Sequence, residues 1–161
     1  GKQLDLLVFL VKKYERDIFP AYRGLIDEIE SIEHVDIPGV GVPLEVRFDL
    51  ITVDGRVIDH KTAGRKAPGV EHNLQLNLYA FAYYQKRKQL PRSVELHVAK
   101  KISKEIEVRS VSPTFNEVMK SVNFLQGVYK RIGDNDFTPV IGYGCKFCPH
   151  KEDCDRVFLG I

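Results

Sequence analysis

The spacing of apolar residues changes from a helical to a strand period near residue 40. Over 3–16 the apolar side chains recur about every 3.6 residues, which predicts an amphipathic helix. A second short helix is predicted over roughly 21–30, and the segment 33–36 is predicted to be extended. Pro38-Gly39-Val40-Gly41 predicts a turn, because proline and glycine interrupt regular structure.

The middle of the chain predicts a β-hairpin. Between Leu44 and Ile51 apolar and polar residues alternate, as in a strand with one buried face. Asp54-Gly55 marks the turn, and 57–61 predicts the returning strand. Downstream, the pattern predicts a helix over 71–88, strands over 93–100 and 105–111, and a last helix over 114–131. This order predicts an α/β fold, a sandwich in which helices cover a central sheet.

The loop length of the hairpin decides which side chains share a face. A two-residue loop puts Asp49 opposite His60 and turns Asp59 into the apolar row, whereas a three-residue loop puts Asp49 opposite Asp59. Burying Asp59 and Lys61 among apolar side chains would be costly, so we predict the longer loop. It implies a type I turn with Gly55 left-handed in a bulge. One face then carries Leu44, Val46, Phe48, Leu50 and Ile58, and the other carries Glu45, Arg47, Asp49, Asp59 and Lys61.

Composition limits the class of protein without deciding its partner. The chain has 161 residues, 43% hydrophobic and 29% charged, which suits one globular domain with a full core. No apolar run approaches the roughly 20 residues needed to cross a bilayer, so no membrane partner is expected. The net charge of +2 neither demands nor excludes nucleic acid, because the placement of charge matters more than its sum.

The charged face of the hairpin supplies the parts of a phosphodiesterase. Carboxylates such as Asp49 and Asp59 can hold a hard divalent cation that polarises a phosphoryl oxygen and acidifies water. The ammonium of Lys61 can orient that water or stabilise developing charge. Spacing alone favours a solvated hairpin face with cross-strand ion pairs over a metal site.

Three motifs in order narrow the choice: Arg47-Phe48-Asp49, then Val57-Ile58-Asp59-His60-Lys61-Thr62, then Gln75-Leu76-Asn77-Leu78-Tyr79. This order resembles the RecB-like nucleases of the PD-(D/E)XK superfamily. The resemblance implies a restriction-endonuclease-like sandwich, a central mixed sheet flanked by helices. It implies that Asp49, Asp59 and the backbone carbonyl of His60 bind Mg²⁺ or Mn²⁺, that Lys61 is catalytic, and that Gln75 and Tyr79 brace the site.

The family also has an upstream metal ligand on a helix, and here the match is poor. Glu28 is the preferred candidate and Glu33 the alternative, while His34 lies in the wrong kind of segment. The chain starts abruptly inside a predicted helix. We therefore expect a single domain over 1–161 that is a fragment lacking its N-terminal part, with a cysteine-containing loop over 143–156.

Three cysteines, Cys145, Cys148 and Cys154, lie within ten residues of one another. This grouping favours metal binding over disulfides. Their spacing resembles the iron–sulfur subgroup of the family, which includes AddB-type nucleases and a CRISPR-associated exonuclease, in which a distant fourth cysteine completes a [4Fe-4S] cluster. Zn²⁺ held with His150, or three free thiols, are the alternatives.

These features together predict a cytoplasmic, metal-dependent deoxyribonuclease, acting as an exonuclease or on single strands in recombination, repair, phage or CRISPR processes. DNA is the expected partner, with a helicase or a recombination or CRISPR protein as a further one. Two other functions are open: a nucleic-acid-binding module that no longer cuts, and a metal-binding interaction domain whose working part is the cysteine loop.

Overall fold

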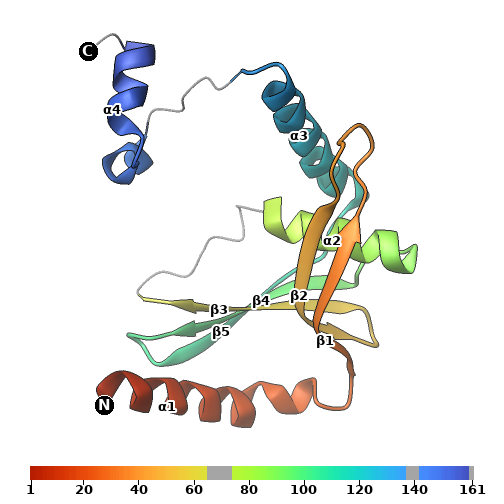
Figure 1. The fold of residues 1–161 in the computed structure, drawn as a ribbon. Coiled ribbons are helices and arrows are strands. Elements are labelled where there is room, and N and C mark those ends of the chain that lie inside the picture. Colours follow the sequence, from red (N-terminus) through yellow and green to blue (C-terminus); the bar gives the residue numbers. More distant parts are fainter. Residues whose placement is uncertain (65–73, 137–141, 160–161) are drawn as a thin grey trace. The chain divides into compact units, whose positions relative to one another are not determined.

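A computed structural model describes residues 1–64, 74–136 and 142–159 (Figure 1). The chain divides into two compact units, Gly1–Gln126 and Gly127–Ile161. The larger unit contains the hairpin and the Gln75–Tyr79 motif, and the smaller contains the cysteines. His72, near the start of the helix predicted over 71–88, lies outside the described residues.

The larger unit is built on a mixed sheet in the strand order β1-β2-β3-β4-β5. Neighbouring strands are antiparallel except β3 and β4, which are parallel and joined through helix α2. The strands are β1 (Ile26–Val35), β2 (Leu44–Thr52), β3 (Arg56–Ala63), β4 (Ser93–Lys100) and β5 (Glu105–Val111). The predicted α/β sandwich with a central mixed sheet is confirmed.

Helices cover both faces of this sheet (Figure 1). Helix α2 (Leu74–Arg87) packs on one face and, with the first part of α3 (Phe115–Gly133), encloses the main hydrophobic core. Helix α1 (Lys2–Asp17) lies on the other face, where it contacts His60 and His97. Because side chains alternate along β3, Val57 and Asp59 face α2, whereas Ile58 and His60 face away from it.

The predicted hairpin register is confirmed. Leu50 pairs with Ile58 and Ile51 with Val57, as a three-residue loop requires. Gly55 has a φ of +84°, and its N–H donates to the carbonyl of Thr52 at 3.0 Å, which closes the turn. A Cβ at Gly55 would meet Tyr83 Oη at 3.4 Å, a second reason for glycine here.

The predicted single apolar face of β2 is wrong. Phe48 packs with Ile51 in the core under α2, whereas Leu50 belongs to a second cluster with Tyr22 and Ile58. Regular alternation cannot place Phe48 and Ile51 on one side, so β2 changes orientation between them. The pairing between β2 and β3 also ends at this point, with Leu50 and Ile58. A strand that no longer pairs with its neighbour can rotate about its own axis. The spacing of apolar residues in the sequence gives no sign of such a rotation.

The helix predicted over 21–30 is also wrong. A short 3₁₀ turn, η1 (Phe19–Ala21), leads into the ten-residue strand β1, which already begins at Ile26. Pairing along nearly all of β2 satisfies the backbone groups of β1, and this long-range pairing overrides local helix propensity. The extended segment predicted at 33–36 is the end of this longer strand.

The smaller unit begins in the last turns of α3 and contains short helices. These are the 3₁₀ segment η2 (Tyr143–Phe147), the single turn α4 (Lys151–Cys154) and a π-helical segment, η3 (Asp155–Leu159). No helix in the described part of the chain is long and apolar enough to cross a membrane.

Candidate active site

Asp59 is the most enclosed acidic side chain of the hairpin, with 2% of its surface exposed. Tyr79 donates a hydrogen bond from its hydroxyl to Asp59 Oδ1 at 2.8 Å. Lys61 Nζ lies 3.0 Å from Asp59 Oδ2. Burying a carboxylate is costly unless it is paired, and here a phenol and an ammonium provide that pairing.

Helix α2 places Tyr79 above β3. Gln75, one helical turn earlier, donates from Nε2 to Tyr79 Oη at 2.8 Å, so a chain of hydrogen bonds runs from Gln75 through Tyr79 to Asp59. Burial and the bond to Asp59 raise the pKa of Tyr79 well above its usual value, so the phenol keeps the proton that it donates. The two residues of this motif therefore fix the orientation of one carboxylate.

Asp49 lies on β2, where that strand separates from β3. The backbone N–H of His60 donates to Asp49 Oδ2 at 2.7 Å, so a side chain replaces a strand-to-strand bond. Three tenths of the Asp49 side chain is exposed. The register that pairs Leu50 with Ile58 brings Asp49 next to Asp59 along the hairpin.

A polar network lies on the opposite face of β3. Tyr14 Oη is 2.9 Å from His60 Nε2 and 2.7 Å from His97 Nδ1, and His97 Nε2 is 3.2 Å from Glu95 Oε2. Tyr22 donates to the same Glu95 oxygen at 2.8 Å. Our sequence analysis named His60 only for its backbone carbonyl and missed a role for the other four side chains. Glu95 and His97 lie on β4, Tyr14 lies on α1 and Tyr22 follows η1. The one available signal was a glutamate and a histidine, two residues apart, within an otherwise apolar strand.

The charges in this network follow from burial and hydrogen bonding. Burial by itself would raise the pKa of Glu95, but hydrogen bonds from His97, Tyr22 and Ser93 outweigh it and lower the pKa to about 2. Burial and then the neighbouring His97 lower the pKa of His60, which favours a neutral ring. Burial raises the pKa of Tyr14, so its phenol is protonated.

The structure brings neither Glu28 nor Glu33 to the aspartates. Both lie on β1, and both form ion pairs with Lys86 at the end of α2, Glu28 at 2.7 Å. Glu28 also accepts from Arg87 at 2.7 Å. These ion pairs link the edge strand β1 to α2. The two carboxylates therefore have cationic partners without a metal ion.

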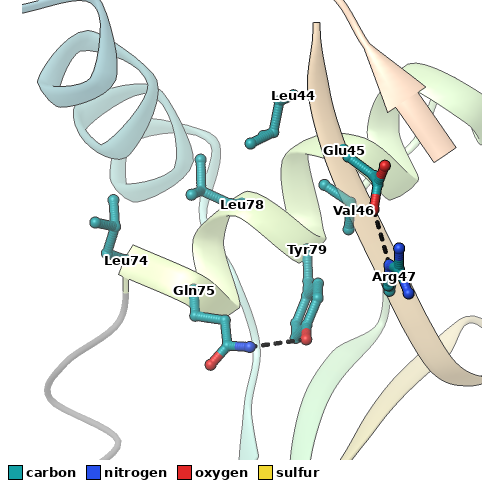
Figure 2. A pocket seen from close by; sticks show the side chains of 8 residues that line it. All are labelled: Leu44, Glu45, Val46, Arg47, Leu74, Gln75, Leu78 and Tyr79. Carbon is teal, nitrogen blue, oxygen red and sulfur yellow. Dashed lines mark hydrogen bonds and ion pairs between the residues drawn. The ribbon is translucent and has the colours of Figure 1, made fainter. Parts of the chain in front are cut away.

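A pocket of about 430 Å³ opens beside Tyr79, between α2 and β2 (Figure 2). Its walls are mostly apolar, and Gln75 and the Glu45–Arg47 ion pair add polar groups to it. The lining residues are Leu44, Glu45, Val46, Arg47, Leu74, Gln75, Leu78 and Tyr79. The Gln75–Tyr79 hydrogen bond thus connects this pocket to Asp59.

A family model described as the PD-(D/E)XK nuclease superfamily matches residues 3–155. The chain belongs to the PD-(D/E)XK nuclease superfamily. Among solved structures, a predicted exonuclease from Eubacterium rectale is similar with a TM-score of 0.67 and 13% identity, covering 95% of this chain and 61% of that one. The structure of SSO0001 is similar with a TM-score of 0.56 and 17% identity, covering 94% and 68%. None of the curated proteins matches the chain.

Nucleases of this superfamily act on nucleic acid and typically use a divalent metal such as Mg²⁺. At these identities the solved structures show the shared fold. The chain spans about three fifths of the length of the Eubacterium rectale protein.

Among the described residues, no three His, Cys, Asp or Glu side chains form a ready-made metal cluster. Asp59 Oδ2 is nevertheless a buried oxygen without a hydrogen-bond partner of good geometry, beside the ammonium of Lys61. Carboxylate oxygens are the donors that Mg²⁺ and Mn²⁺ prefer, so Asp59 and Asp49 fit such an ion.

The cysteines lie in the smaller unit, and no disulfide joins any two of them in the described part of the chain. Cys145 and Cys154 are half-buried and Cys148 is exposed. Cys145 belongs to η2 and accepts a long hydrogen bond from the backbone of Gly142 at its sulfur, while Cys154 ends α4.

Proposed function

We propose that this chain is a divalent-metal-dependent deoxyribonuclease of the RecB-like branch. The observation that carries the proposal is the arrangement at Asp59, where Tyr79 and Lys61 both contact one buried carboxylate, next to Asp49. A buried acid, a second acid and a lysine at the end of one hairpin are the groups that phosphodiester hydrolysis requires.

In this proposal Asp49, Asp59 and the backbone carbonyl of His60 hold Mg²⁺ or Mn²⁺. The bound ion would polarise the phosphoryl oxygen and acidify a water. Lys61 binds and orients the attacking water from its place beside Asp59. Tyr79 holds Asp59 in position, and Gln75 holds Tyr79. Because Glu28 and Glu33 pair with Lys86, they are left out of the proposed metal shell.

The proposed substrate is DNA, cut at ends or as single strands. The apolar pocket beside Tyr79 supports a substrate with unstacked bases, since bases leaving a duplex need apolar surface near the reacting phosphate. The likeness to a predicted exonuclease points the same way. A cytoplasmic location, a helicase or CRISPR partner and the host process stay predictions.

The cysteine loop is proposed to bind a metal centre. Cys145, Cys148 and Cys154 suit an iron–sulfur cluster completed by a ligand beyond these three, with Zn²⁺ as the alternative. Anaerobic purification followed by iron, sulfide and zinc analysis separates these possibilities. Iron with acid-labile sulfide supports the cluster, stoichiometric zinc supports the alternative, and neither metal contradicts both.

The decisive experiment is cleavage of labelled single- and double-stranded DNA with Mg²⁺, Mn²⁺ or EDTA. Wild type should cut DNA with metal and should not cut it in EDTA. Lys61→Ala should cut at least a hundredfold more slowly, because a loss of that size is typical when one group that contacts the transition state is removed. Lys120→Ala is the matched control, because Lys120 is exposed on α3. If Lys61→Ala cuts as fast as wild type, the assigned centre is wrong.

A binding module that no longer cuts is the second candidate. This candidate is favoured because Glu28 and Glu33, the two predicted upstream metal ligands, both form ion pairs with Lys86. Such a module would bind DNA with an affinity that falls with salt and does not depend on metal. Binding in EDTA with no cleavage in any metal would favour it.

A further inference from the structure

We infer that the pocket beside Tyr79 binds one unstacked nucleotide of single-stranded DNA, the neighbour of the nucleotide that is cut. The base of this nucleotide contacts the apolar wall of the pocket, and its phosphate contacts Arg47. The inference rests on the proposed function for the position of the reacting phosphate. It adds a binding site for one nucleotide, made by residues that determine affinity for the strand.

Three leucines form the apolar wall of this pocket (Figure 2). Leu74 and Leu78 lie one turn apart on α2, and Leu44 begins β2 and packs against the core. Leu74 keeps 38% of its surface exposed. Covering such a side chain with an apolar surface is favourable, and the face of a nucleobase is a surface of this kind. The volume of about 430 Å³ is within the range of pockets that bind small molecules.

Arg47 places a positive charge at the edge of the same pocket. Its Nε donates to Glu45 at 2.8 Å, which orients the guanidinium group, and its side chain is 72% exposed. Among the described residues, no hydrogen bond uses either Nη group of Arg47. These two groups can therefore donate to two oxygens of one phosphate, which is the geometry in which arginine recognises phosphate.

The pocket is adjacent to both aspartates of the proposed metal centre. Tyr79, on one wall, donates to Asp59 at 2.8 Å. Arg47, on the other, precedes Asp49 by two residues on β2. At about 3.3 Å per residue their Cα atoms are about 6.6 Å apart, similar to the spacing of neighbouring phosphates in an extended strand. A phosphate at Asp49 therefore places the next phosphate of the strand near Arg47.

An apolar wall beside a phosphate contact favours single strands over a duplex. The bases of a duplex stack on and pair with one another, and a base must give up these contacts before it can enter the pocket. An unpaired base gives up less, so the same apolar contact leaves a larger gain in affinity. The pocket therefore selects DNA that is single-stranded next to the cut.

The test of the apolar wall is binding of the whole chain to single-stranded DNA in EDTA, where neither metal nor cleavage affects the result. Fluorescence anisotropy compares a labelled oligothymidylate with an abasic strand of the same length, and wild type should bind the oligothymidylate more tightly. Leu74→Ala should reduce that affinity about tenfold and leave the affinity for the abasic strand unchanged. Leu4→Ala, which shortens an exposed leucine on α1, should change neither.

The test of the phosphate contact is the salt dependence of the same binding. Arg47→Ala should weaken binding to both strands, because both carry phosphates. The slope of log affinity against log salt concentration should fall by about 0.7, the loss of one phosphate contact on a single strand. Arg92→Ala is the matched control, since Arg92 is 71% exposed and pairs with Asp54 at the hairpin turn. Its salt slope should equal that of wild type.

Leu74→Ala that prefers the strand with bases as strongly as wild type, or Arg47→Ala with an unchanged salt slope, would overturn the inference. A wild type that binds the two strands equally, or binds neither, would overturn it as well. Metal-dependent cleavage that requires Lys61 would then leave the proposed function standing. Conversely, both binding results in a protein that cuts with no metal would support this site and contradict the proposed function. Leu74 and Arg47 are exposed, so their variants are expected to fold, which thermal unfolding checks.

Discussion

The backbone N–H of His60 donates a hydrogen bond of 2.7 Å to the carboxylate of Asp49. The bond lies where β2 and β3 stop pairing, just beyond Leu50 and Ile58. A strand-to-strand bond has been exchanged for a side-chain bond, which leaves one acid partly exposed while the other, Asp59, stays buried. The proposed metal centre thus lies where β2 and β3 separate.

Tyr79→Phe should weaken both the site and the fold. The change removes the hydroxyl that donates to Asp59 Oδ1, so a buried carboxylate loses one of its partners. We expect a loss of roughly 2 kcal/mol in the free energy of unfolding and at least a tenfold loss in cleavage rate. Urea unfolding and the DNA cleavage assay measure the two effects. Tyr84→Phe, which removes a hydroxyl farther along α2, should change neither.

Glu28→Gln and Glu33→Gln should leave cleavage intact. Both carboxylates pair with Lys86, and partly exposed ion pairs contribute little, so each change should cost less than about 1 kcal/mol. The loss should shrink further at high salt. Metal titration of cleavage checks the prediction. A large rise in the metal concentration needed by either variant would restore that residue as a ligand.

Glu95 should make the protein sensitive to acid. Its pKa is lowered from 4.5 to about 2, so its stabilisation is complete above pH 4.5 and is lost as the pH falls toward 2. At 1.36 kcal/mol per pKa unit the effect is of the order of 3 kcal/mol. Urea unfolding between pH 7 and pH 2 should show a flatter acid limb for Glu95→Gln. The exposed Glu15→Gln on α1 should keep the wild-type slope.

Substituting two glycines by alanine should have opposite effects. Gly55 has a left-handed backbone, so Gly55→Ala should destabilise the hairpin by about 1–2 kcal/mol. Gly127 lies in helix α3 with open space at its Cβ position, so Gly127→Ala should stabilise the protein by up to about 1 kcal/mol. Equal effects in thermal unfolding would contradict the turn geometry on which the Asp49–Asp59 register depends.

Much of the fold could be predicted because its signals are local. Alternation predicted β2, and an Asp-Gly turn predicted the hairpin with the register that the structure confirms. The reason given for that register was wrong for Asp59, because this carboxylate is buried beside Tyr79. The strands predicted over 93–100 and 105–111 match β4 and β5 residue for residue. The order of three motifs likewise led to the superfamily that the family model shows.

The sequence by itself determined most of the elements, the turn and the residue types of the candidate site, but it missed most of β1. The tertiary structure decided which distant side chains meet: Lys86 with Glu28 and Glu33, and Tyr14 with His60 and His97, 46 and 83 positions away. It also decided where β2 rotates away from β3. The physical reason is that periodicity records how each segment buries its own apolar face. Pairing between segments is set by the packing of the whole sheet and its helices.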